Sequence, residues 1–280
     1  MENKPLTLGS LFSGSGGFEL AAKIAGIKPV WNSEVEPFSI MVTRKNLPEV
    51  EHLGDICDIK GDEIQPVDII TFGSPCQDLS IAGKRDGLEG SKSNLFYEAI
   101  RIIKEMRCRT NGTKPRYIIW ENVTGAFSSN SGEDFRRVLD EIISVKGAYP
   151  TMPMPKNNKW AYADTIMEDG FSISYRVFDA KFFSLPQRRR RIFLVADFNG
   201  QSSSKILFDK ESLPWNIKKS KEEGKRDTRD SKTSTDNAIC IVDQGGQRMD
   251  IYDNMSGTLK AKGGRAPYVF ENHGQDTRFT

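Results

Sequence analysis

The feature that most constrains the fold of this chain is an apolar run, residues 67–72, that stops abruptly at Gly73-Ser74-Pro75. Such a stop cannot continue a hydrogen-bonded ladder, so the run predicts a buried strand that ends just before Cys76. Parallel sheets bind ligands at the carboxyl ends of their strands. The position of Cys76 therefore favours a nucleophile at a sheet edge, although an isolated cysteine is more often a small buried apolar side chain.

A second strand-to-turn junction lies near the amino terminus. Residues 6–12 read as a strand, residues 13–17 as a glycine-rich turn and residues 18–25 as a short amphipathic helix. In this layout glycines let the backbone approach a ligand at a helix N-terminus. The dinucleotide fingerprint is incomplete, because Glu19 and Leu20 occupy the region of its third glycine. The turn alone is equally compatible with a plain connection.

The next expected strand, residues 29–32, is followed by two acidic residues, Glu34 and Glu36. An acidic side chain about 20 positions after a glycine-rich turn suits a ribose hydroxyl. Two carboxylates would repel a phosphate, so the pattern favours S-adenosylmethionine over a dinucleotide. Asp55 is a candidate acceptor for an adenine amino group, and the alternative is an aspartate in a surface turn.

A second carboxylate follows a third expected strand. Residues 116–120 are strongly apolar and run into Glu121-Asn122-Val123, which would place Glu121 at the same edge as Cys76. Four arginines, residues 188–191, lead into the apolar run 192–196, and strand alternation would send Arg189 and Arg191 to one face. Further helices are expected over residues 38–46, 94–106, 134–145 and 160–167, and a strand over residues 172–180.

Length predicts one large domain with a smaller appendage. The alternating strands and helices predict an α/β protein with a doubly wound, Rossmann-like sheet over residues 1–197, and the change of composition after it predicts a small, mainly β or irregular region over 198–280. Strand-like pieces there are residues 238–242 and 266–270. No apolar run is long enough to span a bilayer, and the four cysteines form no CxxC pair, so we expect an intracellular, cytoplasmic protein without a metal site. Residues 181–232 contain fourteen Lys or Arg against seven Asp or Glu, which indicates a nucleic-acid footprint or a solvated basic face.

Four motifs together make the chain resemble the DNA cytosine-5 methyltransferases over residues 6 to about 196. They are Leu11-Phe12-Ser13-Gly14-Ser15-Gly16-Gly17-Phe18, Pro75-Cys76-Gln77, Glu121-Asn122-Val123 and Gln187-Arg188-Arg189-Arg190-Arg191. The resemblance implies an S-adenosylmethionine-dependent enzyme acting on double-stranded DNA, with S-adenosylhomocysteine as product, in restriction-modification or a related role.

The resemblance also assigns residues to roles. The catalytic residues would be Cys76, Glu121, Gln187, Arg189 and Arg191. The cofactor-binding residues would be Phe12, Gly14, Ser15, Gly16, Gly17, Glu34, Val35, Asp55, Ile56, Pro75 and Leu95. DNA contacts would come from Gln77, Ser80, Lys84, Arg85 and Asn122, within or beside a polar loop, residues 78–93, that we expect to close on the DNA.

The chain departs from the family pattern in two ways. Ser10, Val35 and Ser74 replace the residues usual at their positions. The sequence also ends inside the expected target-recognition region, so we expect either a fragment or a chain that pairs with a complementing chain or self-associates, and that binds cofactor weakly alone. Two other functions stay open at this point: a catalytically incomplete DNA-binding subunit and a nicotinamide-dependent dehydrogenase. The incomplete glycine fingerprint and the run of arginines both argue against the dehydrogenase.

Overall fold

The computed structural model describes residues 4–74, 95–183 and 187–208 in full, and the backbone of four strands between residues 239 and 279. The chain divides into two compact units. The first comprises Met1–Val177 with Ile192–Phe208, and the second comprises Phe178–Arg191 with Asp209–Thr280. A division of the chain at residue 197 remains a prediction.

An eight-stranded sheet in the order β3-β2-β1-β4-β5-β8-β7-β6 organises the first unit. The pairs β1–β2, β2–β3, β1–β4 and β4–β5 are parallel, whereas β6 and β7 are antiparallel. From β1 the chain extends first to β2 and β3 on one side and then to β4 and β5 on the other, which creates a switch point between β1 and β4. The strands are β1 (Thr7–Leu11), β2 (Lys28–Ser33), β3 (Glu51–His52), β4 (Ile69–Phe72), β5 (Tyr117–Val123), β6 (Ala163–Glu168), β7 (Phe171–Asp179) and β8 (Arg190–Asp197).

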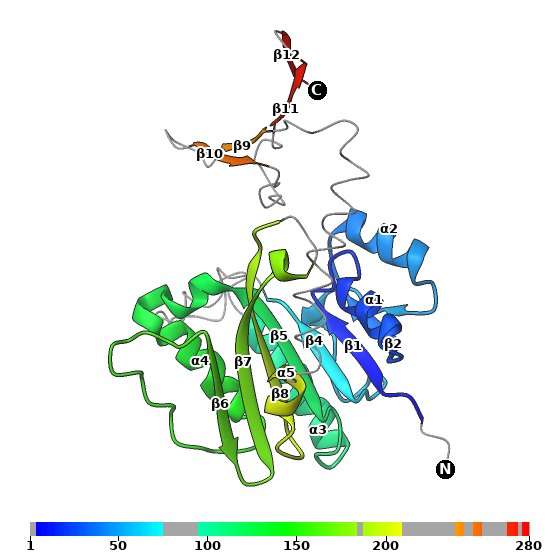
Figure 1. The fold of residues 1–280 in the computed structure, drawn as a ribbon. Helices are drawn as coiled ribbons and strands as arrows, with labels where there is room; N and C mark the ends of the chain where they lie inside the picture. Colours follow the sequence, from blue (N-terminus) through cyan, green and yellow to red (C-terminus); the bar gives the residue numbers. More distant parts are fainter. Residues whose placement is uncertain are drawn as a thin grey trace, which may run out of the picture. The chain divides into compact units, whose positions relative to one another are not determined.

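Helices lie on both faces of this sheet (Figure 1), which confirms the predicted α/β class. Apolar residues of α3 recur at helical spacing and are buried, among them Phe96, Ala99, Ile103 and Met106. They join the larger core cluster with Trp120 of β5. The helices are α1 (Gly17–Ile24), α2 (Pro37–Asn46), α3 (Leu95–Arg109), α4 (Glu133–Ile143) and α5 (Ser203–Phe208), with 3₁₀ turns η1 (Ile56–Asp58), η3 (Thr124–Phe127), η4 (Ser129–Gly132) and η5 (Ala180–Phe182).

One element differs in kind from the sequence prediction. The helix expected over residues 160–167 is wrong, because this segment contains β6, which pairs with β7 from Ala163 to Glu168. Asp169 and Gly170 connect the two strands, and Gly170 has a left-handed φ of 66°. Asp-Gly between two extended runs is a strong hairpin signal, so the turn chemistry overrides the local helical spacing.

The second unit contains a small sheet in the order β10-β9-β11-β12, in which all three neighbouring pairs are antiparallel. Its strands are β9 (Ile239–Asp243), β10 (Met249–Asp253), β11 (Tyr268–His273) and β12 (Asp276–Phe279). The strand-like pieces expected at residues 238–242 and 266–270 coincide largely with β9 and overlap β11. The composition of this region therefore favours the antiparallel β-structure that is observed.

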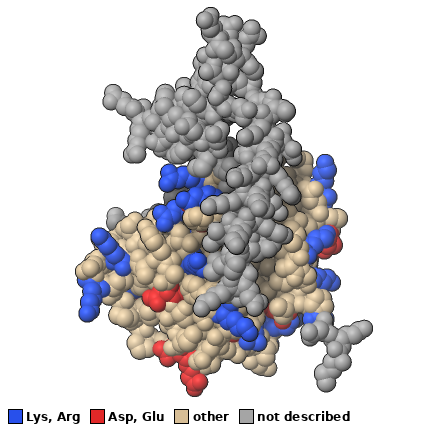
Figure 2. Space-filling model, viewed as in Figure 1, with Lys and Arg blue, Asp and Glu red and all other residues tan. Residues whose placement is uncertain are grey.

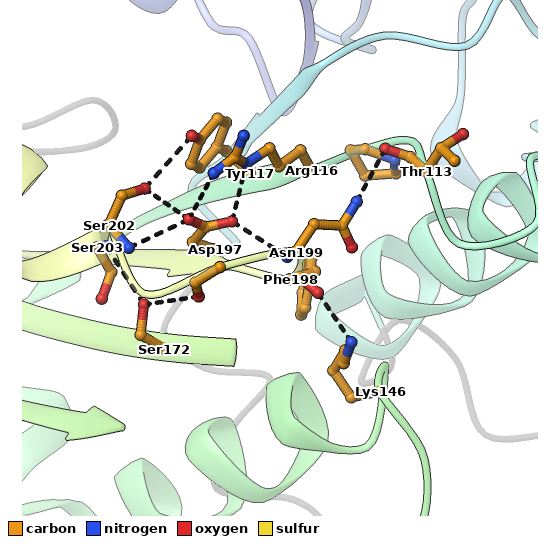
Figure 3. A network of polar contacts seen from close by, with 12 residues as sticks. Thr113, Arg116, Tyr117, Lys146, Ser172, Asp197, Phe198, Asn199, Ser202 and Ser203 are labelled. Carbon is orange, nitrogen blue, oxygen red and sulfur yellow. Dashed lines mark hydrogen bonds and ion pairs between the residues drawn. The ribbon is translucent and has the colours of Figure 1, made fainter. Parts of the chain in front are cut away.

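A polar network closes the turn that follows β8 (Figure 3). The carboxylate of Asp197 is fully buried and accepts hydrogen bonds from Arg116 Nε at 3.0 Å and from Arg116 Nη2 at 3.1 Å. Ser202 donates to it from both its amide and its hydroxyl, and the Asn199 amide donates at 3.1 Å. Arg116 directly precedes β5, so the network lies at the amino end of β5, opposite the end that carries Glu121.

Candidate active site

The glycine-rich turn after β1 has a backbone that its sequence makes possible. Gly14 and Gly16 have positive φ values of 54° and 87°, and Phe12 also has a positive φ, 56°. A β-carbon on Gly16 would lie 3.0 Å from Thr43 Cγ2 and 3.1 Å from Leu47 Cδ1, so only glycine lets the turn pack this closely on α2. A non-glycine residue such as Phe12 in this region stores strain of the kind that clusters at ligand sites.

Glu34, at the end of β2, is hydrogen-bonded to this turn. Its Oε2 accepts from the Gly14 amide at 2.7 Å, while its Oε1 accepts from the amides of Val35 at 2.8 Å and Glu36 at 2.9 Å. Each carboxylate oxygen has two acceptor positions, so Oε1 is used fully and Oε2 keeps one for a further donor. The arrangement therefore fits the predicted contact with a ribose hydroxyl.

Asp55 lies close to the end of β2 as well. The Ser33 hydroxyl donates to the Gly54 carbonyl at 2.7 Å, and the Leu53 amide donates to the Asn32 carbonyl at 2.8 Å. Asp55 itself is exposed and caps η1 by accepting from the Cys57 amide at 2.9 Å. The structure thus brings Asp55 to the same sheet edge as Glu34, with one carboxylate oxygen engaged in the cap.

Other predicted cofactor residues surround this edge with different exposures. Ile56 is buried in the larger core, whereas Val35 is 61% exposed. Ser15 and Gly17 are exposed in the turn and the first position of α1, and Leu95 is half-buried at the start of α3.

The ends of β4 and β5 meet beside the predicted nucleophile position. A β-carbon on Gly73 would lie 3.7 Å from Glu121 Oε2, and Asn122 Nδ2 donates to the Ser74 carbonyl at 3.4 Å. Glu121 is half-buried, and Asn122 is buried with its Oδ1 accepting from the Val123 amide at 2.7 Å. The carboxylate of Glu121 therefore lies against the residues that lead into Cys76.

Asn122 has a positioning role in this structure, since its side chain holds the end of β4. The DNA contact predicted for it stays a prediction. Several other predicted residues lie outside the described residues: Pro75, Cys76, Gln77, Ser80, Lys84 and Arg85.

The three remaining predicted catalytic residues belong to the second unit. Gln187 is half-buried, Arg189 is exposed, and Arg191 donates from Nη1 to the Arg190 carbonyl at 2.9 Å. The Ala180 amide donates to the Arg189 carbonyl at 2.9 Å, which pairs the arginine segment with η5. Their predicted roles beside Cys76 and Glu121 stay predictions.

Surface charge and possible metal ligands do not define this site further. On the face shown in Figure 2, basic side chains are visible in more places than acidic ones. The described part of the chain contains no group of three or more His, Cys, Asp or Glu placed to hold a metal ion. Within the same residues, no helix combines the length and the apolar character needed to cross a membrane.

One residue at this edge has a placement that sequence analysis did not foresee. Glu19, noted only as standing where a third glycine would be expected, is fully buried beneath the turn. A glutamate in the first turn of a helix is ordinarily explained by capping or by the helix dipole, so the sequence carried no signal for its burial.

A family model that covers most of the chain identifies one family, and curated relatives are similar to parts of the chain. The family model for C-5 cytosine-specific DNA methylase matches residues 6–150 and 155–267. Type II methyltransferase M.BsuFI of Bacillus subtilis is 32% identical over 190 residues, which cover 68% of this chain and 39% of that protein. Type II methyltransferase M2.BsuMI of Bacillus subtilis (strain 168) is 32% identical over 205 residues, covering 73% of this chain and 45% of that protein.

A third relative carries a different name. The DNA N-6-adenine-methyltransferase of Escherichia phage P1 is 29% identical over 238 residues, which cover 76% of this chain and 31% of that protein. The chain therefore spans between about a third and under half of the length of these curated relatives.

Proposed function

Since the chain belongs to the C-5 cytosine-specific DNA methylase family, we propose that it methylates carbon 5 of a cytosine in double-stranded DNA through a covalent adduct with Cys76. The observation that carries this proposal is the position of the Glu121 carboxylate against Gly73, whose chain continues through Ser74 to Cys76. A nucleophile and a carboxylate at neighbouring strand ends are the two groups that this chemistry requires.

Cys76 supplies the nucleophile in this proposal. Carbon 5 of cytosine is too weakly nucleophilic to accept a methyl group, and a thiolate that adds to carbon 6 turns the ring into an enamine-like species that can. S-adenosylmethionine, when bound, supplies the methyl group. Loss of the proton from carbon 5 and elimination of Cys76 then release the product. A free thiol has a pKa of about 8.5, so Arg189 and Arg191 are proposed to favour the thiolate.

Glu121 acts on the base. Its carboxyl group hydrogen-bonds nitrogen 3 and the amino group of the cytosine and stabilises the charge that develops as the thiolate adds. The base must leave the duplex to reach this group, so the proposal includes base flipping. The predicted loop over residues 78–93 would contribute Lys84 and Arg85 to the phosphates, and Gln77 and Ser80 to the target site.

The cofactor is proposed to bind at the switch point between β1 and β4. Glu34 has one free acceptor position there for a ribose hydroxyl, and Asp55 stands near the same strand end. The strained Phe12 and the left-handed glycines of the turn bring backbone amides toward this edge. These features support S-adenosylmethionine as the cofactor.

Nucleoside analysis of DNA methylated by the purified chain tests the proposal. We expect 5-methylcytosine by mass spectrometry, and bisulfite sequencing then gives the target sequence. N6-methyladenine without 5-methylcytosine would contradict the cytosine assignment and favour the chemistry named for the phage P1 relative. DNA and cofactor binding without any methylated base would instead favour a subunit that needs a second chain.

A further inference from the structure

A row of polar side chains crosses the sheet close to its carboxyl edge. Ser10 of β1 is the register partner of both Asn32 of β2 and Thr71 of β4, and Asn32 is in turn the partner of His52 of β3. Residues in register project from the same face of a sheet, so these four side chains form one line. Ser10, Asn32 and Thr71 are each at most 1% exposed, which is unusual for a polar series across neighbouring strands.

Glu19 of α1 lies over this row. It is 0% exposed, and its Oε2 is 4.0 Å from the position of a β-carbon on Gly16. A glutamate three residues into a helix usually bonds the amide of the capping residue. Here the amide of Gly16 donates to the Ser13 carbonyl at 3.0 Å instead, so the carboxyl group does not complete a capping box.

The hydrogen bonding of this region is incomplete. Neither carboxyl oxygen of Glu19 accepts a hydrogen bond of normal geometry from a described residue, although Asn32 and Ser10 lie near enough to lower its pKa in part, and the hydroxyls of Ser10 and Thr71 lack such a bond as well. Ser13 and Ser74, just beyond the ends of β1 and β4, have unpaired buried hydroxyls as well. Within the described part of the chain, every buried side-chain oxygen without a partner belongs to this group. Unpaired buried oxygens at one strand edge indicate that a further group completes them.

Electrostatics favour the neutral form of Glu19. Burial raises its pKa, its own backbone amide, Asn32 and Ser10 oppose the rise in part, and the negative charge of Glu34 adds to it. His52 of β3 is the last member of the row, with Nδ1 2.9 Å from Asn32 Oδ1. Its pKa is lowered by burial and by Arg44, against the opposing effect of Glu34, so His52 adds little positive charge.

We propose that Glu19 is a positioning residue of the glycine-rich turn, present as a carboxylic acid in the free chain and converted to a carboxylate when a cationic nucleoside ligand binds there. This inference rests on the proposed function, which supplies that ligand: S-adenosylmethionine carries a sulfonium and an ammonium group. The proton lost by Glu19 passes to solvent. The resulting carboxylate attracts the ligand's positive charge and thereby helps to position the glycine-rich turn.

Isothermal titration of the 280-residue chain with S-adenosylmethionine, repeated in buffers of different ionisation enthalpy over a series of pH values, measures the protons released on binding. For the unmodified chain we expect release that Glu19→Gln removes. The same substitution should weaken S-adenosylmethionine about tenfold and S-adenosylhomocysteine, which lacks the sulfonium charge, by less. Glu63→Gln is the matched control, because Glu63 is exposed in an ion pair with Lys60 and should leave both ligands and proton release unchanged.

A second variant separates charge from packing. Thr71→Val removes an unpaired hydroxyl from the same row without changing charge, and it should leave proton release intact. Equal release by the unmodified chain and Glu19→Gln, or equal weakening of both ligands without any release, would overturn the inference while leaving the proposed function in place. No binding of either ligand to the unmodified chain would overturn the proposed function itself, and the inference with it.

Discussion

Each of the two edges of the large sheet buries one carboxyl group completely, but the two carboxyl groups differ in their hydrogen bonding. At the amino end of β5, Asp197 accepts five hydrogen bonds from described residues, from Arg116, Asn199 and Ser202. At the carboxyl edge, Glu19 lacks a hydrogen-bond partner among the described residues. Both side chains are 0% exposed, and they differ in the hydrogen bonds that they accept.

The pKa values move in opposite directions for this reason. Burial alone would raise the pKa of Asp197, but the bonds from Arg116, Ser202 and the backbone outweigh it and the pKa lies below the ordinary range. Burial of Glu19 is offset only in part, by its own backbone amide, Asn32 and Ser10, and its pKa is raised. A buried carboxylate that accepts hydrogen bonds is compatible with a stable fold. A buried carboxyl group that lacks them lowers stability, which indicates a functional rather than a structural role.

The largest expected effect is a loss of methyl transfer, on substitution of the proposed nucleophile. Cys76→Ser should lower methyl transfer by at least about a thousandfold, because a hydroxyl is a far weaker nucleophile than a thiolate at neutral pH. The free energy of unfolding should change little. Trapping on DNA that contains 5-fluorocytosine tests this directly: a covalent adduct that persists in Cys76→Ser would exclude this thiol as the nucleophile.

Glu121→Gln tests the second group at that edge. We expect turnover to fall about a hundredfold, because the carboxyl group stabilises charge that develops on the base. Binding of S-adenosylmethionine should change little, since Glu121 acts on the base and not on the methyl donor. Single-turnover methylation together with a cofactor titration separates the two, and a parallel collapse of cofactor affinity would place Glu121 in a different role.

Asp197→Asn is the corresponding change at the amino edge. It should lower the free energy of unfolding at neutral pH by about 2 kcal/mol, because charged hydrogen bonds from Arg116 are lost, and it should leave cofactor binding intact. The folded pKa lies below the unfolded value, so the stabilisation is present above the unfolded pKa and is lost as pH falls through the folded pKa. Urea unfolding of both proteins should therefore converge in strong acid, and a difference that persists there would contradict the charge argument.

The smallest expected effect has the opposite sign. Glu19→Gln should raise the free energy of unfolding of the ligand-free chain by about 1 kcal/mol at neutral pH, because a buried carboxyl group without partners is replaced by a neutral amide of similar shape. The folded pKa of Glu19 is above the unfolded value, so its penalty is absent below the unfolded pKa and complete above the folded one. Thermal unfolding across this pH range should show no gain below the unfolded pKa and a gain that grows as pH rises above it. A destabilised variant at neutral pH would mean that Glu19 has a structural partner.

The sequence by itself determined most of the elements and the order of the motifs. The apolar runs that precede Gly73 and Glu121 are strands, and the turn at Gly14 and Gly16 has the left-handed backbone that its glycines predict. These features are local: side-chain periodicity and backbone freedom are set by residues a few positions apart. The position of Glu34 beside the glycine-rich turn was also predictable, because its distance along the chain follows from one strand-helix-strand unit.

Tertiary structure decided which polar groups are paired. Ser10 meets Asn32 and Thr71 through strand register, and Arg116 reaches Asp197 across 81 positions of the chain. Asn122 Nδ2 donates to the Ser74 carbonyl, which joins the ends of β4 and β5 across 48 positions of the chain. Glu19 reads locally as a helix-capping residue. Its burial depends on how α1 packs on β1 and β2, and contacts between elements so far apart in the chain cannot be read from the residues next to Glu19.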